Sequence, residues 1–271
     1  MLWNVKDGCV LVGGTDMRYV SFGYGQKTLI LLPGLSDGLA TIEGKSLLVA
    51  KPYRLFFEHY TVYLFSRKDV MPDGYSIRDM AADQAAAMET LGLETASVLG
   101  VSQGGMIAQY LALDSPARVE KLVIAVSAAR VNEPLRDCVS RWVKLAEQGD
   151  HKHLMIDTAE RSYSGRRLMK YRKLYPMLGW IGRPKSYDRF LVNANAVLGF
   201  DAYEEIEKIA CPTLILGGED DKIVGAQASY ELHERIAGSQ LYLYKGLGHA
   251  AYEEAPDFNE RVFSFLETSS I

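Results

Sequence analysis

The sequence predicts an α/β protein in which a mostly parallel sheet of eight strands is covered by helices on both faces. Three patterns indicate this class: a hairpin with glycine turns near the start, continuous apolar strands that alternate with helices, and one long helical segment that interrupts the alternation. The 271 residues are 48% hydrophobic and 24% charged, which is ordinary globular composition. A chain of this length can bury a sizeable core.

The first 35 residues alternate β-rich runs with glycine turns, so we expect a hairpin and then a third, more apolar strand. These strands are expected at residues 10–12, 17–22 and 28–32. The third run stops at Pro33 and Gly34, which predicts a tight turn directly after it.

From residue 60 onward the pattern becomes strand, helix, strand, helix. Strands are expected at 60–65, 96–101 and 119–127, and helices at 77–91 and 103–113. The strands are apolar along most of their length, which is typical of parallel strands buried on both faces. We therefore expect the carboxyl ends of these strands to form one edge of the sheet.

The alternation stops between about Glu133 and Leu198, where no strand-like run occurs. This segment reads as several helices and is basic: from Arg130 to Phe190 there are 14 Lys and Arg against 7 Asp and Glu. Strands are expected again at 213–216 and 240–244, with helices at 226–236 and 255–266. A helical insertion after strand six predicts a lid over the active edge. We expect a core of residues 1–132 and 200–271 and a cap of residues 133–199.

A serine lies at the junction of a predicted strand and a predicted helix. The sequence Gly100-Val101-Ser102-Gln103-Gly104 fits G-x-S-x-G, a pattern that is weak by itself and also fits a plain glycine-rich turn. Its setting makes it specific, because the strand leads directly into Ser102 and the helix follows directly after it. The two glycines leave room for strand and helix to approach. The pattern predicts a nucleophile exposed above the sheet.

With this motif the chain resembles the α/β-hydrolase family, and the resemblance extends over nearly its whole length. It implies a histidine base after the last strand, where Gly248-His249 stands. The other four histidines lie in less suitable places: His59 before a strand, His233 on the polar face of a helix, and His151 and His153 in the insertion, where we expect them to be solvated. The base is needed because a serine hydroxyl is a poor nucleophile until its proton is removed.

The resemblance also implies an acidic residue that orients the imidazole, in the loop after strand 213–216. The family pattern places this acid three residues after a glycine, which points to Asp221, while a one-residue slip in the loop would exchange it with Asp220. Gly225 stands where relatives commonly have proline. The chain order Ser102, Asp221, His249 is the order of this fold.

Two backbone N–H groups are expected to stabilise the oxyanion formed during acyl transfer, those of Gln103 and Leu35. The loop before Leu35 reads Pro33-Gly34, where the family commonly has His-Gly. Substrate contacts are expected from Ser36, Trp142 and Val224, although a local turn role fits Ser36 as well. The loop 66–76 departs from the glycine-rich family pattern, and we interpret this departure as scaffold variation.

The expected activity is that of a serine hydrolase that cleaves an ester-type bond of a small molecule through an acyl-enzyme, as carboxylesterases do. A carbon–carbon bond hydrolase of a diketone acid is the first alternative, because it can use the same three residues. A non-catalytic ligand receptor on the same fold is the second. A serine nucleophile argues against the dehalogenases and epoxide hydrolases of this fold, which use aspartate.

Charge and composition limit the expected partners. The net charge of −4 offers no overall basic field for nucleic acid. No signal peptide or membrane-length apolar run is visible, so we expect a cytoplasmic protein without a membrane partner. Three distant cysteines without metal spacing predict reduced thiols, and we expect no metal and no cofactor. The basic insertion leaves three interpretations open: attraction of a carboxylate-bearing substrate, docking of an acidic carrier protein, or a solvated helix surface. The sequence does not indicate the oligomeric state.

Overall fold

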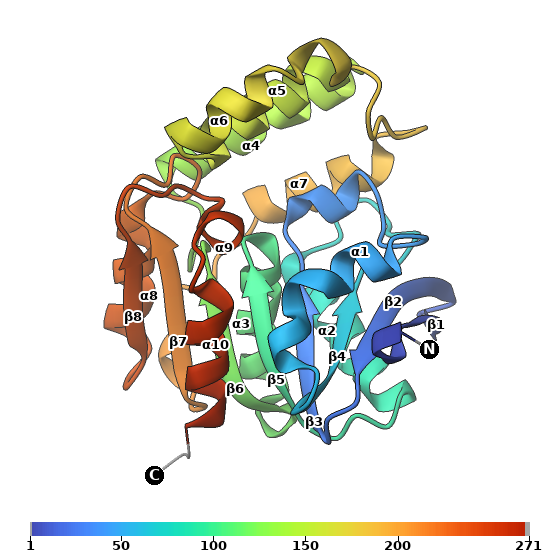
Figure 1. Cartoon of the computed structure of the whole chain (residues 1–271), viewed down its shortest axis with the longest axis vertical. Helices are drawn as coiled ribbons and strands as arrows, with labels where there is room; N and C mark the ends of the chain where they lie inside the picture. Colours follow the sequence, from blue (N-terminus) through green and yellow to red (C-terminus); the bar gives the residue numbers. More distant parts are fainter. Residues whose placement is uncertain (1, 269–271) are drawn as a thin grey trace.

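A computed structural model describes residues 2–268, and its sheet has the eight strands that the sequence predicts. Their order across the sheet is β1-β2-β4-β3-β5-β6-β7-β8 (Figure 1). The pairs β1–β2 and β2–β4 are antiparallel, and the remaining neighbours are parallel. The strands are β1 (Lys6–Val12), β2 (Thr15–Gly23), β3 (Lys27–Leu32), β4 (Tyr60–Phe65), β5 (Ala96–Val101), β6 (Val119–Ala125), β7 (Thr213–Gly218) and β8 (Gln240–Tyr244).

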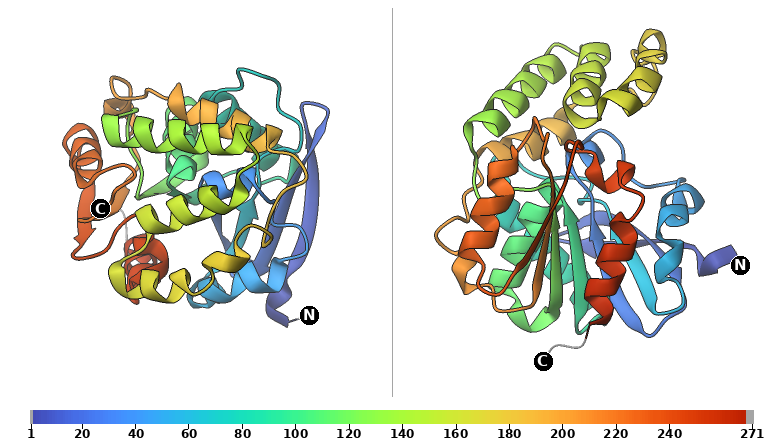
Figure 2. Two further views of the ribbon diagram at one scale, coloured as in Figure 1. Left: turned by 90° about the horizontal axis from the view of Figure 1, so that it is seen from above. Right: turned by 60° about the vertical axis from the view of Figure 1, so that its left-hand side comes forward.

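Helices cover both faces of the sheet because successive side chains of its central strands point to opposite sides. In β3, Ile30 and Leu32 belong to one core layer, whereas Leu29 and Leu31 belong to the other. The first layer includes residues of α2 (Ile77–Thr90), α3 (Gln103–Asp114) and α8 (Ala226–Arg235). The second includes residues of the short α1 (Ser46–Ala50), α9 (Ala251–Glu254) and α10 (Phe258–Glu267), and Figures 1 and 2 show this arrangement.

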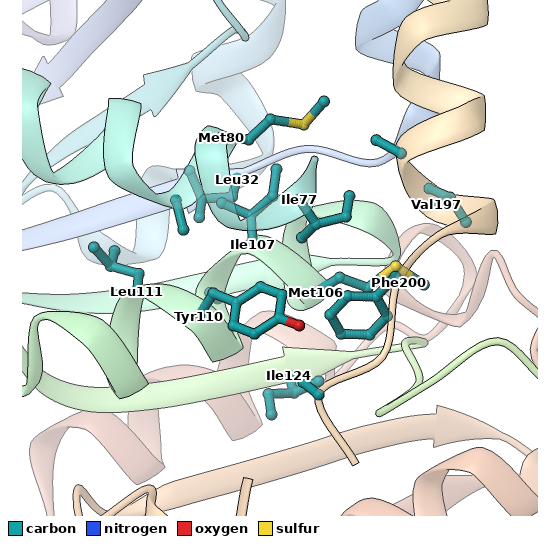
Figure 3. Close-up of a cluster of buried hydrophobic side chains, with 14 of the residues drawn as sticks. Leu32, Ile77, Met80, Met106, Ile107, Tyr110, Leu111, Ile124, Val197 and Phe200 are labelled. Carbon is teal, nitrogen blue, oxygen red and sulfur yellow. The ribbon is translucent and has the colours of Figure 1, made fainter. Parts of the chain in front are cut away.

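The first core layer joins the sheet to the helical segment that lies between β6 and β7. Figure 3 shows side chains of α2 and α3 packed together with Val197 and with Phe200, which lie at the end of that segment. The labelled residues are Leu32, Ile77, Met80, Met106, Ile107, Tyr110, Leu111, Ile124, Val197 and Phe200. The insertion therefore shares its hydrophobic core with the α/β frame.

Polar side chains define where two of the helices begin. Before α2, the Ser76 hydroxyl accepts the Asp79 backbone N–H at 3.1 Å, and the Asp79 carboxylate accepts the Ser76 N–H at 2.9 Å. This capping box satisfies two backbone groups that the helix itself leaves unpaired. Before α4, the Asn132 side chain accepts the Leu135 N–H at 3.1 Å in the same manner.

The insertion consists of helices α4 (Glu133–Glu147), α5 (His151–Ser162), α6 (Gly165–Arg172) and α7 (Asp188–Leu198). Its two ends leave the core side by side, because Arg130 and Asp201 form an antiparallel bridge and the Ala202 N–H donates to the Ala129 carbonyl at 2.8 Å. In Figure 1, α4, α5 and α6 lie above the carboxyl ends of the strands, and α7 lies between them and the core.

The structure differs from the sequence prediction near the C-terminus. The helix expected at 255–266 is α10, which begins three residues later, after Pro256, and the short α9 before it was not predicted. The short α1 and the 3-10 turn η2 (Leu35–Gly38) were not predicted. None of the helices in residues 2–268 has the length and apolar character needed to cross a membrane.

Candidate active site

Ser102 lies on a strained turn between β5 and α3. Its backbone has φ 53° and ψ −119°, in the left-handed region that residues with side chains rarely adopt. Gly100 and Gly104 make this turn possible. A Cβ on Gly100 would lie 2.7 Å from the Cα of Gly105, and a Cβ on Gly104 would collide with the Leu32 carbonyl. The glycines of G-x-S-x-G are therefore required by close backbone contacts.

Three predicted residues meet at the carboxyl edge of the sheet. The Ser102 hydroxyl oxygen is 2.9 Å from Nε2 of His249, and Nδ1 of His249 is 2.8 Å from a carboxylate oxygen of Asp221. Asp221 follows β7 and His249 follows β8, so neighbouring parallel strands bring together side chains that are distant in sequence. The neighbouring Asp220 is exposed and does not contact the imidazole through a hydrogen bond. The geometry thus selects Asp221 from the two alternatives.

The Asp221 carboxylate determines which nitrogen of His249 carries the proton. A carboxylate only accepts hydrogen bonds, so Nδ1 donates to Asp221 and Nε2 is left to accept the hydroxyl proton of Ser102. Burial by itself raises the pKa of Asp221, but the adjacent imidazole and the N–H groups of Ile223 and Val224 hold this pKa below its usual value. The carboxylate therefore stays ionised at neutral pH.

Two unpaired backbone N–H groups lie in the segments next to Ser102. Gln103 begins α3 and Leu35 begins η2, and neither N–H has an acceptor among residues 2–268. The loop before Leu35 is close to the serine, since a Cβ on Gly34 would lie 3.3 Å from Cβ of Ser102. The N-terminus of α3 adds a positive helix-dipole end at the same place. These donors suit a developing oxyanion.

A cavity of about 120 Å³ opens beside Ser102 and His249. Its lining is largely apolar, with hydroxyl groups from Ser36, Thr158 and Ser162. The apolar lining residues are Leu35, Leu39, Trp142, Leu154, Met155, Phe190, Ile223 and Tyr252. No Lys or Arg belongs to this lining among the described residues. The cavity is therefore suited to an uncharged, mainly apolar group.

The three predicted substrate contacts have different outcomes. Ser36 and Trp142 line the cavity, and the Trp142 indole N–H donates to Asp157 at 2.9 Å. Val224 does not line it. Instead its N–H donates to Asp221 at 3.0 Å and its side chain is buried in the first core layer, while Ile223 lines the cavity.

One expectation about a polar residue is corrected by burial. His151 is not solvated: it is 2% exposed, and its ring nitrogen Nε2 is 3.0 Å from the Ile181 carbonyl. In the loop after β4, which we interpreted as scaffold variation, Arg67 and Lys68 are both buried and hydrogen-bonded. Nothing in the local sequence indicates this burial, because the partners of Arg67 lie in other segments.

None of the Lys and Arg side chains of the basic insertion lines the cavity. Arg161 pairs with Asp157 at 2.8 Å and Arg172 with Glu160 at 2.8 Å, so two of its cations are neutralised locally. Four others are exposed on and just after α6: Arg166, Arg167, Lys170 and Lys173. Within residues 2–268, no group of three or more His, Cys, Asp or Glu side chains is arranged to hold a metal ion.

Comparisons with known proteins agree with this fold. Residues 69–256 match the family model described as "Serine aminopeptidase, S33". A Caulobacter vibrioides protein named "Putative carbamate hydrolase RutD" is 30% identical over 213 residues, which cover 73% of this chain and 74% of that protein.

Solved structures give the same fold. MGS-M2, an α/β-hydrolase from a Medee basin deep-sea metagenome library, has a TM-score of 0.84 at 20% identity, covering 97% of this chain and 98% of its own. The enol-lactonase of Burkholderia xenovorans LB400 has a TM-score of 0.80 at 20% identity, covering 96% and 100%. With a family model that spans most of its length, the chain belongs to the α/β-hydrolase family and is a hydrolase.

Proposed function

We propose that this hydrolase cleaves an ester-type acyl bond of a small molecule through an acyl-enzyme on Ser102, as carboxylesterases do. The observation that carries the proposal is the continuous hydrogen-bonded chain from the Ser102 hydroxyl through His249 to Asp221. A buried base oriented by a carboxylate and aimed at a serine on a strained turn is the arrangement that activates a hydroxyl as a nucleophile.

Each group has a defined task in this reaction. Ser102 Oγ attacks the carbonyl carbon while Nε2 of His249 takes the hydroxyl proton, and Asp221 stabilises the resulting imidazolium. The N–H groups of Leu35 and Gln103 bind the oxyanion. When the tetrahedral intermediate collapses, His249 gives its proton to the leaving group and the acyl-enzyme remains. Water, activated by the same imidazole, then releases the acid and restores Ser102.

The cavity favours a short, uncharged acyl group. A cavity of about 150 Å³ holds a molecule the size of benzene, so the cavity beside Ser102, at about 120 Å³, accommodates a slightly smaller group. A diketone acid would bring a carboxylate, for which the lining offers no cation. This lack makes the carbon–carbon hydrolase the weaker alternative. The aligned hydrogen bonds around His249 likewise argue against a non-catalytic receptor.

Carbamate hydrolysis is a second candidate, supported by the carbamate hydrolase name of the Caulobacter vibrioides relative. A carbamate is attacked at its carbonyl in the same manner as an ester, so the same three residues serve both reactions. Its nitrogen adds a hydrogen-bond donor, and the hydroxyl groups of Ser36, Thr158 and Ser162 provide acceptors within the cavity.

A panel with one common leaving group separates these candidates. Wild type and Ser102→Ala are assayed with p-nitrophenyl acetate, butyrate, octanoate and N-methylcarbamate, and separately with a diketone acid. We expect the short esters to be cleaved fastest and Ser102→Ala to lose about 10⁶-fold in kcat. A fluorophosphonate should label wild type once, at Ser102. Folded wild type that gains no adduct and cleaves no ester would refute the proposal, and faster cleavage of the carbamate would favour the second candidate.

A further inference from the structure

A buried cluster of charged side chains lies behind the two segments that carry the unpaired N–H groups. Arg67 follows β4, Asp37 belongs to η2 and Arg189 belongs to α7 of the insertion. The side chains of Arg67 and Asp37 are 5% and 1% exposed. The mechanism above uses none of the three, although burying such charges is strongly unfavourable unless they are paired.

Arg67 connects the two segments directly. Its Nη2 donates to the Pro33 carbonyl at 2.6 Å and to Oε1 of Gln103 at 3.0 Å. Pro33 is two residues before Leu35, and Gln103 itself supplies the second N–H. One guanidinium therefore fixes the distance between the loop after β3 and the start of α3, which is the distance that matters to an oxyanion held between them.

The side chain of Gln103 extends this connection to the insertion. Its Nε2 donates to the Asn193 carbonyl of α7 at 3.0 Å. Because a guanidinium can only donate and a carbonyl can only accept, this environment allows a single orientation of the amide. Gln103 is thus held from both sides, by Arg67 in the core and by α7 above it.

Asp37 fixes the other end of the loop. Its Oδ2 accepts the Arg67 backbone N–H at 2.9 Å and Nη2 of Arg189 at 2.7 Å, and Arg189 also donates to the backbone carbonyls of Asp37 and Arg67. Leu35 therefore lies between two fixed points, Pro33 and Asp37. The three side chains carry one negative and two positive charges, which leaves an excess positive charge near the developing oxyanion.

We propose that Arg67 is a positioning residue that sets the oxyanion-binding N–H groups of Leu35 and Gln103, and that Asp37 and Arg189 lock it to the insertion. This inference rests on the proposed function. It explains why an arginine stays buried although its Nε and Nη1 have no hydrogen-bond partner among the described residues. Burial lowers the pKa of Arg67 to about 10, so the guanidinium keeps its charge at neutral pH.

The neighbouring Lys68 provides a matched control. It is also buried, and its Nζ donates to Asp83 at 3.1 Å and to the Tyr75 hydroxyl at 2.5 Å, but its side chain has no hydrogen bond to Pro33 or Gln103. Arg67→Met and Lys68→Met each remove one buried cation from the same loop. Both should lower the melting temperature, and only the first should disturb the oxyanion donors.

The test compares these two variants and Arg67→Lys with wild type on p-nitrophenyl acetate. We expect Arg67→Met to lower kcat about 10²-fold with little change in KM, since losing a single oxyanion donor has an effect of this size. Inhibition by a trifluoromethyl ketone, which forms a tetrahedral adduct, should weaken by a similar factor. Arg67→Lys should recover part of the loss, and Lys68→Met should keep the kcat of wild type.

The outcomes separate this inference from the proposed function. Folded Arg67→Met with the kcat of Lys68→Met, or with a change in KM alone, would overturn the positioning role while leaving wild-type turnover and the Ser102 adduct intact. Absence of turnover and of adduct in wild type would instead refute the proposed function, and the positioning role with it.

Discussion

Ser102 combines the side chain that we propose as nucleophile with an unfavourable backbone conformation. A residue with a Cβ at φ 53° and ψ −119° is strained by about 1–3 kcal/mol, whereas glycine adopts such angles readily. The strain is retained because the turn raises the hydroxyl toward His249, 2.9 Å away. Stability and reactivity therefore oppose each other at this one position.

Because the backbone of Ser102 is strained, Ser102→Ala and Ser102→Gly, both expected to be inactive, should differ in stability. Ser102→Ala keeps the strained backbone, and Ser102→Gly relieves it at the cost of a more flexible unfolded chain. We expect the glycine variant to be more stable by about 1 kcal/mol, measured by urea unfolding of both proteins. Equal stability, or a more stable alanine variant, would mean that the backbone of residue 102 is not strained in this turn.

Asp221 should be essential through its charge and not only through its shape. In Asp221→Asn the amide would donate toward Nδ1 of His249, so the proton would move to Nε2 and the base would no longer accept the proton of Ser102. We expect kcat to fall about 10⁴-fold without unfolding. Steady-state kinetics with p-nitrophenyl acetate and circular dichroism check both parts. An Asn variant as active as wild type would contradict the role of the carboxylate.

The lowered pKa of Asp221 also predicts a dependence of stability on pH. A carboxyl group whose pKa is lower in the folded state stabilises the fold above its unfolded pKa of about 3.9, and this contribution disappears as the pH falls through the lowered pKa. The free energy of unfolding of wild type should therefore fall relative to that of Asp221→Asn below about pH 4. Urea titrations of both proteins across this range measure the difference.

At this scale the sequence predicted residues whose signals are local. Ser102 was predicted from the G-x-S-x-G motif at a strand–helix junction and His249 from the family resemblance, and the structure places the two side chains 2.9 Å apart. The family spacing favoured Asp221 over the adjacent Asp220, and the fold shows that Asp221 is the one that meets the imidazole. Arg67 was missed since its partners Pro33, Gln103 and Asp37 come from other parts of the chain.

Among the elements, the junction of β5 and α3 depends on close backbone contact with the loop after β3. A Cβ on Gly104 would collide with the Leu32 carbonyl and lie 2.8 Å from that of Pro33. Both carbonyls belong to the backbone and not to a flexible side chain, so the backbone itself would have to move. The start of α3 and the loop after β3 are consequently packed together as one unit.

Gly104→Ala should therefore be far more harmful than a similar change elsewhere. We expect it to destabilise the protein by more than about 3 kcal/mol or to prevent folding, as severe overpacking does. Gly165→Ala is the control: Gly165 begins α6, and a Cβ there meets nothing within 4 Å. Thermal unfolding of both variants tests this difference, and a mild effect of Gly104→Ala would show that the loop can yield.

The order of strands and helices was predictable because strands buried on both faces, such as β3, β5 and β6, have largely apolar sequences. The exact start of α10 was less visible, since Pro256 lies in the first turn of the helix expected at 255–266, where proline is tolerated. The direction of the Val224 side chain was not predictable either, because it depends on how the loop after β7 turns around the Asp221 carboxylate.

In the whole molecule, the insertion is fastened on two sides of the cavity. On one side α7 holds Asp37 and Gln103 through Arg189 and Asn193. The other side carries a separate set of bonds. There the Ala250 N–H donates to the Ser162 carbonyl at 2.9 Å, and the Ser164 N–H donates to Glu254 at 2.8 Å. The cavity lies beneath the helices that these contacts hold in place.

Loosening the second side should admit longer substrates. Glu254→Ala removes the carboxylate that accepts both the N–H and the hydroxyl of Ser164. Losing one charge-assisted hydrogen bond of about 1.5 kcal/mol makes the population of molecules with this contact open roughly tenfold larger. We expect kcat/KM for p-nitrophenyl octanoate to rise up to about tenfold relative to the acetate. Glu147→Ala, at an exposed carboxylate of α4, is the control. An unchanged ratio would show that this contact does not limit access.

The two attachments differ in what they allow evolution to change. Since we propose that contacts beside Gln103 also align the oxyanion donors, a substitution there should lower the rate and be selected against before a new substrate is gained. Contacts beside Ser164 do not involve the groups that we propose for proton transfer and oxyanion binding. Descendants of this enzyme with altered substrate preference should therefore differ mostly along α5, α6 and α9, while α7 and its partners stay the same.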